Sequence, residues 1–588
     1  MFFRAKNGIT QLVFCIFLCL CSSLCFTWSA TMFSNVAVGA ITSIILCFPM
    51  IALHRLNKKN EVKLNKASVV ICFLLAFLWL MAESFKPGNA ALFSYISGKT
   101  VLFSVVYTIG AFHLLTEFAK IFHSMLHASF SSTSKLSEII SGLSAKKIFI
   151  LLCIFYIPHI LMSFPGMLCV DSDHQLAQFF GRMPFTAHHP PAHTLLLGTL
   201  IQIGTFISGG HQIFGYFLFV LVQSFILLLI LTYMFVTMKK LRTPGVLMLI
   251  SFLLVTVSPY FTAYAGAILK DCLYSYMFLL FMIEFLWLLV LKQDYWKSAL
   301  HHVLYFVSVC GVYLFRNNGK HVLVIAILSY LIFLLKTKAI QKTKKNIVFL
   351  ILPIVISFVF SAAIMHIFSI EKGSIKETLS LPFQQTARYV LQHHDEVTPK
   401  EKEAIDRILA YDQLAEIYDP NISDPVKETY KNPSVQEFLS YVGVWATQGW
   451  KHPYTYIEAT VEQNQSLYYP FMVNGTICDI NVLDSHPIFA KISDIRTKLY
   501  HILFHFPVLS LLSNVAFWNL ILLLLCSFSL QKKYGSFFIA AIVALASDLV
   551  IVFAPCIWMH PRYAFPIVYS MPLLLAYYIY VNSKQIHK

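Results

Sequence analysis

The sequence predicts an all-α polytopic membrane protein, and its composition and the spacing of its apolar residues carry that prediction. Of the 588 residues, 58% are hydrophobic and 12% are charged, whereas about a quarter of the residues of an ordinary soluble domain are charged. The mean hydropathy is +0.69. Apolar stretches of about 20 residues, the length that crosses a bilayer as a helix, recur along nearly the whole chain.

We expect about 14 transmembrane helices, each marked by one such stretch. The first stretch follows Arg4 and Lys6 as a signal peptide would. It is long and further stretches succeed it, so we interpret it as the first span. The expected spans are residues 10–30, 36–53, 67–84, 98–119, 148–165, 213–237, 245–258, 272–291, 298–314, 320–336, 347–367, 506–529, 535–553 and 563–581.

Basic residues gather in the short loops between these stretches and predict the orientation of the chain. Short loops rich in Lys and Arg stay on the cytoplasmic side of a membrane. Every basic loop obeys this rule only if residues 192–207, which are apolar enough to cross, form a juxtamembrane helix at the outer surface instead. We therefore predict that both termini are cytoplasmic.

The same pattern divides the chain into four segments. Residues 1–147 hold four N-terminal helices, 148–370 a core of spans, and 505–588 three C-terminal spans. Residues 371–504 contain 18 of the 28 acidic residues and 12 of the 44 basic ones, so they carry a net charge of −6. The excess of basic residues lies in the short loops, which indicates membrane lipids and no nucleic acid as partners.

Residues 371–504 are predicted to form a small, mainly helical domain outside the membrane. Thr398-Pro399-Lys400-Glu401 has the residues of an N-cap, a first-turn proline and a capping box. Further helices are expected after Asn432-Pro433 and around residues 454–465, and no alternating strand pattern is present.

The 13 cysteines of the chain lie mostly inside apolar stretches. Their spacing suggests neither a disulfide framework nor a metal site. We expect them to be small buried hydrophobic residues.

The segment between residues 164 and 193 concentrates ionisable and turn-forming residues. It contains Asp171-Ser172-Asp173-His174-Gln175 and then His188-His189-Pro190-Pro191-Ala192-His193. Ionisable groups at a membrane boundary are costly unless they are solvated, paired or metal-bound, so they mark a candidate functional site. A structural alternative stays open, because Ser172 and Gln175 fit a capping box and the two prolines could begin the next helix.

Two kinds of ligand fit this segment. His189 and His193 are four residues apart and would share a helix face, which suits a divalent metal ion. Asp171, His188 and His189 are the candidate metal ligands. His188 could instead bind a phosphate as a cation, and the segment lacks a fixed set of metal ligands.

Further cations lie in loops that the predicted topology places on the same face as Asp171. Each cation alone could extend to lipid headgroups, and Lys270 with Asp271 could be an interfacial ion pair. Together they indicate an anionic ligand at the outer leaflet, most simply a lipid phosphate. These cations are Lys270, Arg316, Lys320 and Arg562.

A carboxylate near fixed cations suits the attack of a hydroxyl on a phosphate-linked sugar. The carboxylate removes the proton of the acceptor hydroxyl, and the cations stabilise the departing phosphate. Because no sugar nucleotide is present outside the cell, such a sugar would arrive on a lipid carrier.

The order of these features resembles the GT-C class of membrane glycosyltransferases over about residues 148–340. An acidic pair, Asp171 and Asp173, lies in the first outer loop, and a Pro-led juxtamembrane helix and a span that ends in basic residues follow. Enzymes of that class use polyprenyl-phosphate sugars and place a catalytic Asp in this loop, often with a second acid in the next. The resemblance implies Asp171 as general base or metal ligand, Asp173 as its substitute and Asp271 as the second acid.

The chain more closely resembles, over most of its length, a bacterial family of large uncharacterised membrane proteins assigned to that class. Under this resemblance four helices precede the usual core, and their role is unassigned. The matching residues are Phe164-Pro165-Gly166, Asp171-Ser172, His189-Pro190, Lys270-Asp271, Arg316-Asn317-Asn318-Gly319, the run Leu381-Pro382-Phe383-Gln384-Gln385-Thr386-Ala387-Arg388, and Arg562-Tyr563 with Pro566.

The sequence therefore predicts a glycosyltransferase of the bacterial plasma membrane. It would move a sugar from a polyprenyl-phosphate carrier to an extracytoplasmic hydroxyl of an envelope glycan, with a divalent metal ion as the one cofactor considered. The candidate phosphate-binding residues are Lys270, Arg316, Lys320, Arg388, His560 and Arg562.

Two alternatives remain. A transporter or flippase of lipid-linked saccharides would need charges near the bilayer midplane and an internal repeat. Glu284 and Asp548 lie within spans, but the sequence shows no convincing repeat. In a non-catalytic assembly scaffold, the ionisable segment would tolerate substitution.

Overall fold

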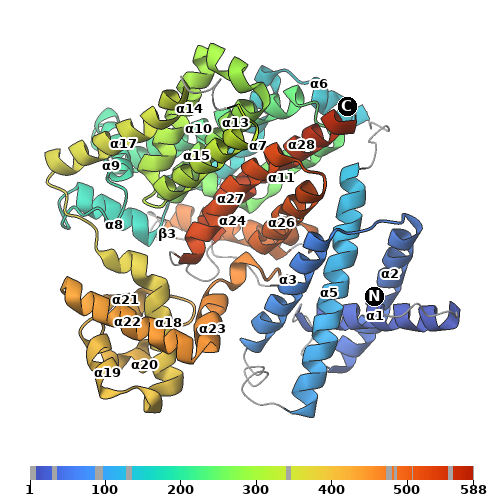
Figure 1. Ribbon diagram of the computed structural model, residues 1–588. Coiled ribbons are helices and arrows are strands. Elements are labelled where there is room, and N and C mark those ends of the chain that lie inside the picture. The colour runs from blue at the N-terminus through green and yellow to red at the C-terminus, as the bar shows by residue number, and fades with distance from the viewer. Residues whose placement is uncertain are drawn as a thin grey trace. The chain divides into compact units, whose positions relative to one another are not determined.

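Helices form almost all of the regular structure of the protein. The computed structural model describes residues 8–29, 36–86, 97–127, 135–339, 346–471, 480–481, 487–505, 507–553 and 561–586. In these ranges, eleven helices are long and apolar enough to cross a membrane (Figure 1). The chain is an all-α, multi-pass membrane protein, as the sequence predicts.

Thirteen of the 14 predicted spans each coincide with one helix, whereas the span 506–529 falls on two short helices, Pro507–Leu512 and Val515–Gln531. Three of the helices fall short of a full span. Helix α11 (Gly245–Val257) is followed by α12 (Pro259–Thr262), and the chain bends by 58° between α11 and the segment Pro259–Gly266. Helices α14 (Ala299–Phe315) and α26 (Val515–Gln531) have 17 residues each. The count of 14 stays a prediction.

Residues 192–207 belong to a short apolar helix, α9 (Pro191–Ile207), that is not among the eleven candidate spans. It has Pro191 in its first turn, and it packs against α8 (Val170–Phe179) and α10 (Gln212–Lys240). Its last residues, Phe206 and Ile207, are 87% and 75% exposed. Its length and exposed apolar end suit a juxtamembrane helix.

The chain forms two compact units, each built from separate parts of the sequence. The first comprises Met1–Ser129, Gln384–Met472 and Asn519–Lys533. The second comprises Phe130–Phe383, Val473–Trp518 and Tyr534–Lys588.

The first unit contains four N-terminal helices whose interfaces hold buried charges. Helix α1 (Gly8–Ser29) packs against α2 (Val36–Lys59) and α5 (Gly98–His127), and α3 (Lys66–Ser84) packs against α5. Glu83 in α3 and Glu117 in α5 are each 1% exposed. Glu83 is paired with Lys86, whose Nζ lies 2.8 Å from its Oε1, and with the hydroxyl of Tyr469.

The first unit also contains residues 384–472, which belong to the polar, mainly helical segment predicted at residues 371–504. Thr398 and Glu401 form the predicted capping box at the start of α19, and Ser434 and Glu437 form another at the start of α22. The helices of this segment are α18 (Ser380–His393), which starts in the second unit, α19 (Pro399–Asp406), α20 (Leu414–Ile417), α21 (Asp424–Glu428), α22 (Val435–Lys451) and α23 (Pro453–Gln463).

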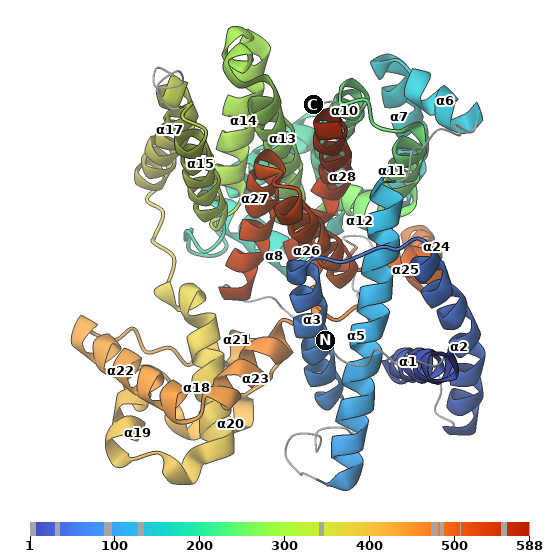
Figure 2. The same ribbon diagram turned by 45° about the vertical axis from the view of Figure 1, so that its right-hand side comes forward.

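The second unit is organised around α13 (Lys270–Leu291), which is buried along nearly its whole length. Helices α10, α14, α27 (Gly535–Phe553) and α28 (Phe565–Ile586) pack around it (Figure 2). Helix α15 (Gly319–Lys336) packs against α27, and α17 (Ile347–Ile367) packs against α9 and α14. The remaining helices of this unit are α6 (Lys135–Gly142), α7 (Ala145–Met162), α24 (Pro487–His505) and α25 (Pro507–Leu512).

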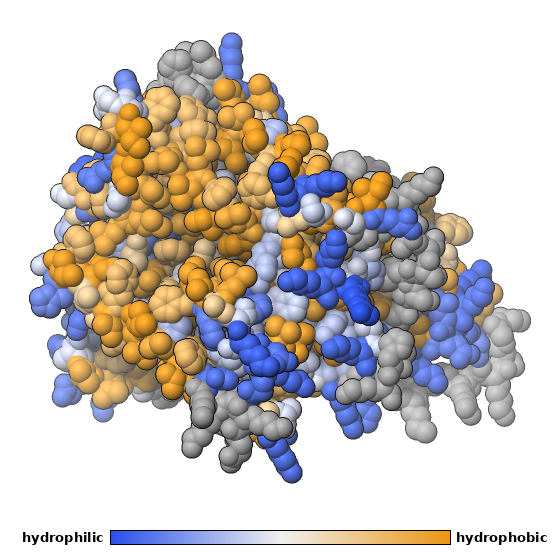
Figure 3. Space-filling view, turned by 90° about the horizontal axis from the view of Figure 1, so that it is seen from above, coloured by the Kyte–Doolittle hydropathy of each residue, from blue (hydrophilic) through white to orange (hydrophobic). Residues whose placement is uncertain are grey.

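Apolar side chains lie on the surface as well as in the core. They form wide continuous areas on the face shown in Figure 3. Helix α17 is an example, because most of its large apolar residues, such as Val348 and Phe358 at 62% exposure each, are not covered by protein. Continuous exposed apolar surface of this kind suits contact with lipid.

A small sheet of three two-residue strands lies in the second unit. Strand β1 (Met167–Leu168) pairs in parallel with β2 (Ala267–Ile268) and antiparallel with β3 (Ile480–Asn481). The sheet directs the two chain segments that carry the candidate acids Asp171 and Asp271.

Candidate functional site

Two parallel strands place Asp171 beside Asp271. Met167 lies opposite Ala267, and Leu168 lies opposite Ile268. Each strand is followed after one residue by a helix, α8 or α13, whose second residue is an Asp. Because parallel strands in register carry their following residues forward side by side, the two helices begin next to each other with one carboxylate each.

Glycines allow the close contact beneath this pair. A Cβ on Gly166, which has φ +145°, would lie 2.6 Å from Cδ1 of Ile268. A Cβ on Gly266 would lie 2.3 Å from Cβ of Ser163. Both contacts are too short for a side chain, so each strand must be preceded by glycine. The spacing Gly-x-x-x-x-Asp, repeated 100 residues apart, is the signal in the sequence that could have predicted this pairing.

Ser172 and Gln175 connect helices rather than cap α8. The N-cap of α8 is Cys169, with no side-chain cap bond. The Ser172 hydroxyl donates instead to the carbonyl oxygen of Ile268 in β2, and the Gln175 amide lies 2.9 Å from Oγ1 of Thr194 in α9. The alternative of a capping box is therefore wrong, because both side chains hold α8 against its neighbours.

Three cations surround the two carboxylates. Oδ2 of Asp171 lies 2.9 Å from Nζ of Lys270 and 3.4 Å from NH1 of Arg562. Oδ1 of Asp271 lies 3.2 Å from NH1 of Arg316, and its Oδ2 lies 4.0 Å from Nε of Arg562. Arg562 thus links the two acids. We call these five residues, together with His189, the ion-pair cluster.

Aromatic rings fix the two arginines. The guanidinium of Arg316 lies over the rings of Tyr274 and Tyr563, at 5.3 and 5.1 Å from their centres. That of Arg562 lies 5.1 Å from the centre of the Tyr563 ring. Cation–π contacts of this kind hold a guanidinium in place without neutralising it. Tyr274 was not predicted, although its position one helical turn after Asp271 could have indicated it.

His189 is neutral and turns one nitrogen toward Lys270. Its Nδ1 lies 2.8 Å from Nζ of Lys270, which has only hydrogens to donate, so Nδ1 accepts. Burial, and after it the positive charge of Lys270, lowers the pKa of His189 to about 2. The proton therefore sits on Nε2, which is buried and has no hydrogen-bond partner among the described residues.

Asp171 is ionised despite its partial burial. Burial alone would raise the pKa of its carboxyl, but the charges of Lys270 and Arg562 outweigh burial and hold this pKa well below its usual range. Its side chain is 25% exposed, whereas that of Asp271 is fully buried. Both oxygens of Asp271 lack a hydrogen-bond partner among the described residues, so only ion pairs compensate its burial.

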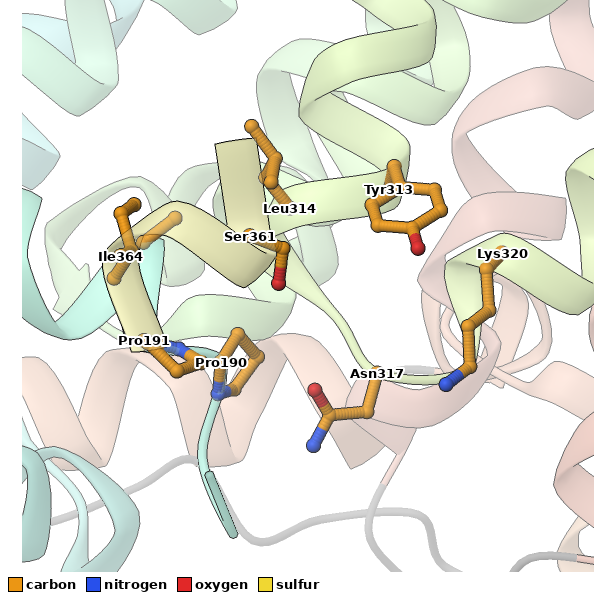
Figure 4. A pocket seen from close by; sticks show the side chains of 9 residues that line it. Pro190, Pro191, Tyr313, Leu314, Asn317, Lys320, Ser361 and Ile364 are labelled. Carbon is orange, nitrogen blue, oxygen red and sulfur yellow. The ribbon is translucent and has the colours of Figure 1, made fainter. Parts of the chain in front are cut away.

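A cavity of about 70 Å³ is lined in part by residues that follow members of the ion-pair cluster in the sequence (Figure 4). Pro190 and Pro191, which follow His189, form one part of its wall. Its polar lining groups include the side chains of Asn317 and Lys320. The Asn317 amide is 3.0 Å from the carbonyl oxygen of His188, so it ties the loop after Arg316 to the loop before α9.

The three candidate metal ligands do not fit a divalent ion. The Lys270 ammonium already lies against both Asp171 and Nδ1 of His189, and a second cation there would be repelled. His188 is half-exposed, and its Nδ1 lies 3.6 Å from Oε1 of Glu377. We therefore derive no step through a metal at this site.

The other predicted residues lie in different surroundings. Asp173 is exposed on α8 and makes none of the ion pairs described above. Arg388 lies in the first unit, where Nε is 3.0 Å from Oε2 of Glu458 and NH1 contacts Glu462. Arg388 is 7% exposed, and these two carboxylates neutralise its guanidinium. His560 lies outside the described residues.

The prediction that the cysteines are unpaired is wrong at Cys169. This residue, which caps α8 directly after β1, is disulfide-bonded. Ten other cysteines in the described ranges are free. A disulfide could not be predicted at Cys169 because this residue lies in an apolar stretch and no regular spacing singles it out.

Comparison with known proteins identifies a family but no relative of known activity. No curated protein and no solved structure matches the chain. A family model does match residues 180–588, which is more than half of the chain and includes every residue of the ion-pair cluster except Asp171. The chain belongs to this family, which is described as a family of unknown function (DUF6020).

Proposed function

We propose that the protein is a glycosyltransferase of the bacterial plasma membrane, of GT-C type, that uses a polyprenyl-phosphate-linked sugar. It would transfer the sugar to a hydroxyl of an envelope glycan on the extracytoplasmic side. The observation that carries the proposal is the ion-pair cluster, in which three cations from three chain segments meet two carboxylates at the ends of α8, α13 and α14.

The charge of the cluster suits a lipid-linked phosphate. Lys270, Arg316 and Arg562 contribute three positive charges, Asp171 and Asp271 two negative charges, and His189 is neutral, which leaves one positive charge. A phosphodiester that joins a sugar to a polyprenyl chain carries one negative charge. Bound phosphate would therefore neutralise the cluster, and arginine is well shaped to bind its oxygens.

The transfer itself needs one base and a stabilised leaving group. The acceptor oxygen attacks the anomeric carbon of the sugar while the bond from that carbon to the phosphate oxygen breaks. The electron pair of this bond stays on polyprenyl phosphate, whose second negative charge the arginines and Lys270 stabilise. The proton of the acceptor hydroxyl passes to Asp171, the more exposed of the two acids.

Donor binding would make Asp171 a better base. With Lys270 and Arg562 directed at it, the carboxylate holds its proton too weakly to be an efficient base. A phosphate that draws these two cations toward itself would raise the pKa of Asp171. Asp171 would then act as an efficient base only when the donor is bound.

Two observations support an extracytoplasmic position for the cluster. Cys169, two residues before Asp171, is disulfide-bonded, and disulfides persist in oxidising compartments outside the cytoplasm. Helices α13 and α28 begin near the cluster, and lysines lie at their far ends, as Lys292 and Lys584. Lysines at that end favour its cytoplasmic location.

The test uses a deletion strain with a defined defect in an envelope glycan. Asp171→Asn removes the base but keeps the shape of the side chain, so it should insert normally and restore none of the modification. Asp173→Asn is the matched control, because Asp173 lies on the same helix turn and is exposed. Full restoration by Asp171→Asn at wild-type protein level would refute the proposal.

A further inference from the structure

A second group of ionisable side chains lies in the first unit, where α2 and α5 pack together within candidate spans. Nδ1 of His54 lies 3.2 Å from Oε1 of Glu117 and 3.3 Å from Nε2 of His113, which in turn is 3.7 Å from the same oxygen. His113 and Glu117 are 6% and 1% exposed. Buried ionisable groups in a span mark a functional site, and the proposed transferase reaction does not use these.

We propose that His54, His113 and Glu117 bind a divalent transition-metal ion of the Zn²⁺ type. Around a tetrahedral ion with ligands at 2.0–2.1 Å, neighbouring ligand atoms lie about 3.3 Å apart. The three separations of 3.2, 3.3 and 3.7 Å are close to that value. Two imidazoles and one carboxylate are ligands that Zn²⁺ prefers, and they leave a fourth position for water.

The surroundings of His113 set the tautomer that a metal needs. Its Nδ1 lies 2.8 Å from Oγ of Ser22. That hydroxyl has a single hydrogen, which the carbonyl oxygens of Leu18 and Gly110 can take at 3.0 and 3.1 Å. Oγ of Ser22 can therefore accept the Nδ1 hydrogen, and the lone pair of Nε2 then faces the proposed metal position.

The carboxylate of Glu117 is held from outside the cluster. The amide of Asn57 lies 2.6 Å from Oε2, and the ammonium of Lys120 lies 2.7 Å from Oε1. Carboxylates that bind metals are commonly hydrogen-bonded in this way. Lys120 also competes with a metal for Oε1, but its side chain is 26% exposed and can turn to the surface. The side chain of His54 is 24% exposed, so protein does not enclose this group completely.

A comparable group in the same unit has the wrong geometry and serves as a control. The rings of His393 and His452 are stacked with centres 3.8 Å apart and planes at 14°, and both lie near Glu396. Nitrogen lone pairs lie in the ring planes, so nearly parallel stacked rings do not direct them at one ion.

The test measures metal bound to the full-length protein, purified without an affinity tag, stripped with chelator and titrated with Zn²⁺. Wild type and His452→Ala should bind one Zn²⁺ per chain, and Glu117→Gln and His54→Ala should bind it at least about tenfold more weakly. Lys120→Gln should bind it more tightly, because the competing ammonium is gone. Equally tight binding by wild type and Glu117→Gln would refute the site.

A measurement on the wild type alone guards against variants that fail to fold. Co²⁺ bound to two imidazoles and a carboxylate in a tetrahedral site gives intense visible absorption bands, which disappear when Zn²⁺ displaces the ion. We expect these bands at one Co²⁺ per chain. Their absence, or less than one Zn²⁺ per chain at saturation, would overturn the proposal without bearing on the ion-pair cluster.

Discussion

Among single residues, Asp171 and Asp271 differ in how accessible their carboxylates are. Asp271 is fully buried between two arginines, whereas the side chain of Asp171 is 25% exposed. Only an accessible carboxylate can meet an acceptor hydroxyl. Asp271 is therefore better suited to hold Arg316 and Arg562 in position, since removing a buried charge partner leaves the other charge uncompensated.

The low pKa of Asp171 predicts an unusual pH dependence. Lys270 and Arg562 keep the carboxyl ionised in the free protein. A plot of kcat/KM, which reports the free protein, should therefore show no acid limb from Asp171 between about pH 5 and 8. The kcat profile should fall toward acid from a higher pH, because bound phosphate has drawn the cations away. An acid limb of kcat/KM between about pH 5 and 8 that is lost in Asp171→Glu would show that Asp171 is not held ionised in the free protein.

Arg316→Lys should weaken donor binding by about tenfold, or roughly 1.4 kcal/mol. Lysine keeps the charge but cannot stack on Tyr274 and Tyr563 or present two donors to a phosphate. The expected result is a higher KM with a smaller change in kcat. Arg182→Lys is the control, because Arg182 is exposed in a loop of the same unit. Equal KM values for the two variants would argue against phosphate binding by Arg316.

The residues of the site could be predicted from the sequence better than their contacts. Asp171, Lys270, Asp271, Arg316 and Arg562 stand out because charges are rare in so apolar a chain, and the structure brings all five together. Arg388 also stands out, but two carboxylates from α23 neutralise it. Such pairing depends on tertiary contacts, which a charge pattern does not reveal.

At the scale of elements, the pairing of β1 with β2 positions the two acids. Gly166→Ala should disturb it, because the new Cβ would meet Ile268 at 2.6 Å in a backbone conformation that favours glycine. We expect a loss of about 1–3 kcal/mol in stability and of most activity. Gly443→Ala is the control, since nothing lies within 4 Å of its Cβ position. Wild-type activity and melting temperature in Gly166→Ala would disprove this role.

Helices were easier to predict than strands for a physical reason. A span needs about 20 apolar residues and leaves a long signal, and every predicted span except 506–529 coincides with one helix. The two-residue strands are too short to show an alternating pattern, and their partners lie 100 or more residues away. The predicted span 245–258 ends where α11 ends, at Ser258-Pro259, a sequence at which helices often stop, but the short helix α12 after the bend was not predicted.

For the molecule as a whole, an extracytoplasmic reaction requires one face of the second unit to lie outside the cell. Met183→Cys, an exposed position in the loop before α9, should react with a membrane-impermeant maleimide in intact cells. Lys336 lies at the end of α15 that is away from Arg316, so Lys336→Cys should react only after the cells are opened. The reverse pattern would invert the orientation and exclude an extracytoplasmic reaction.

Binding of a lipid phosphate by the ion-pair cluster can be measured without knowing which sugar the donor carries. Polyprenyl phosphate, which any such donor releases, is compared with the uncharged polyprenol for binding to the purified full-length protein. We expect the phosphate to bind at least about tenfold more tightly, Arg562→Gln to remove this difference and Asp173→Asn to keep it. Equal binding of the two lipids by the wild-type protein would show that the cluster does not bind the phosphate.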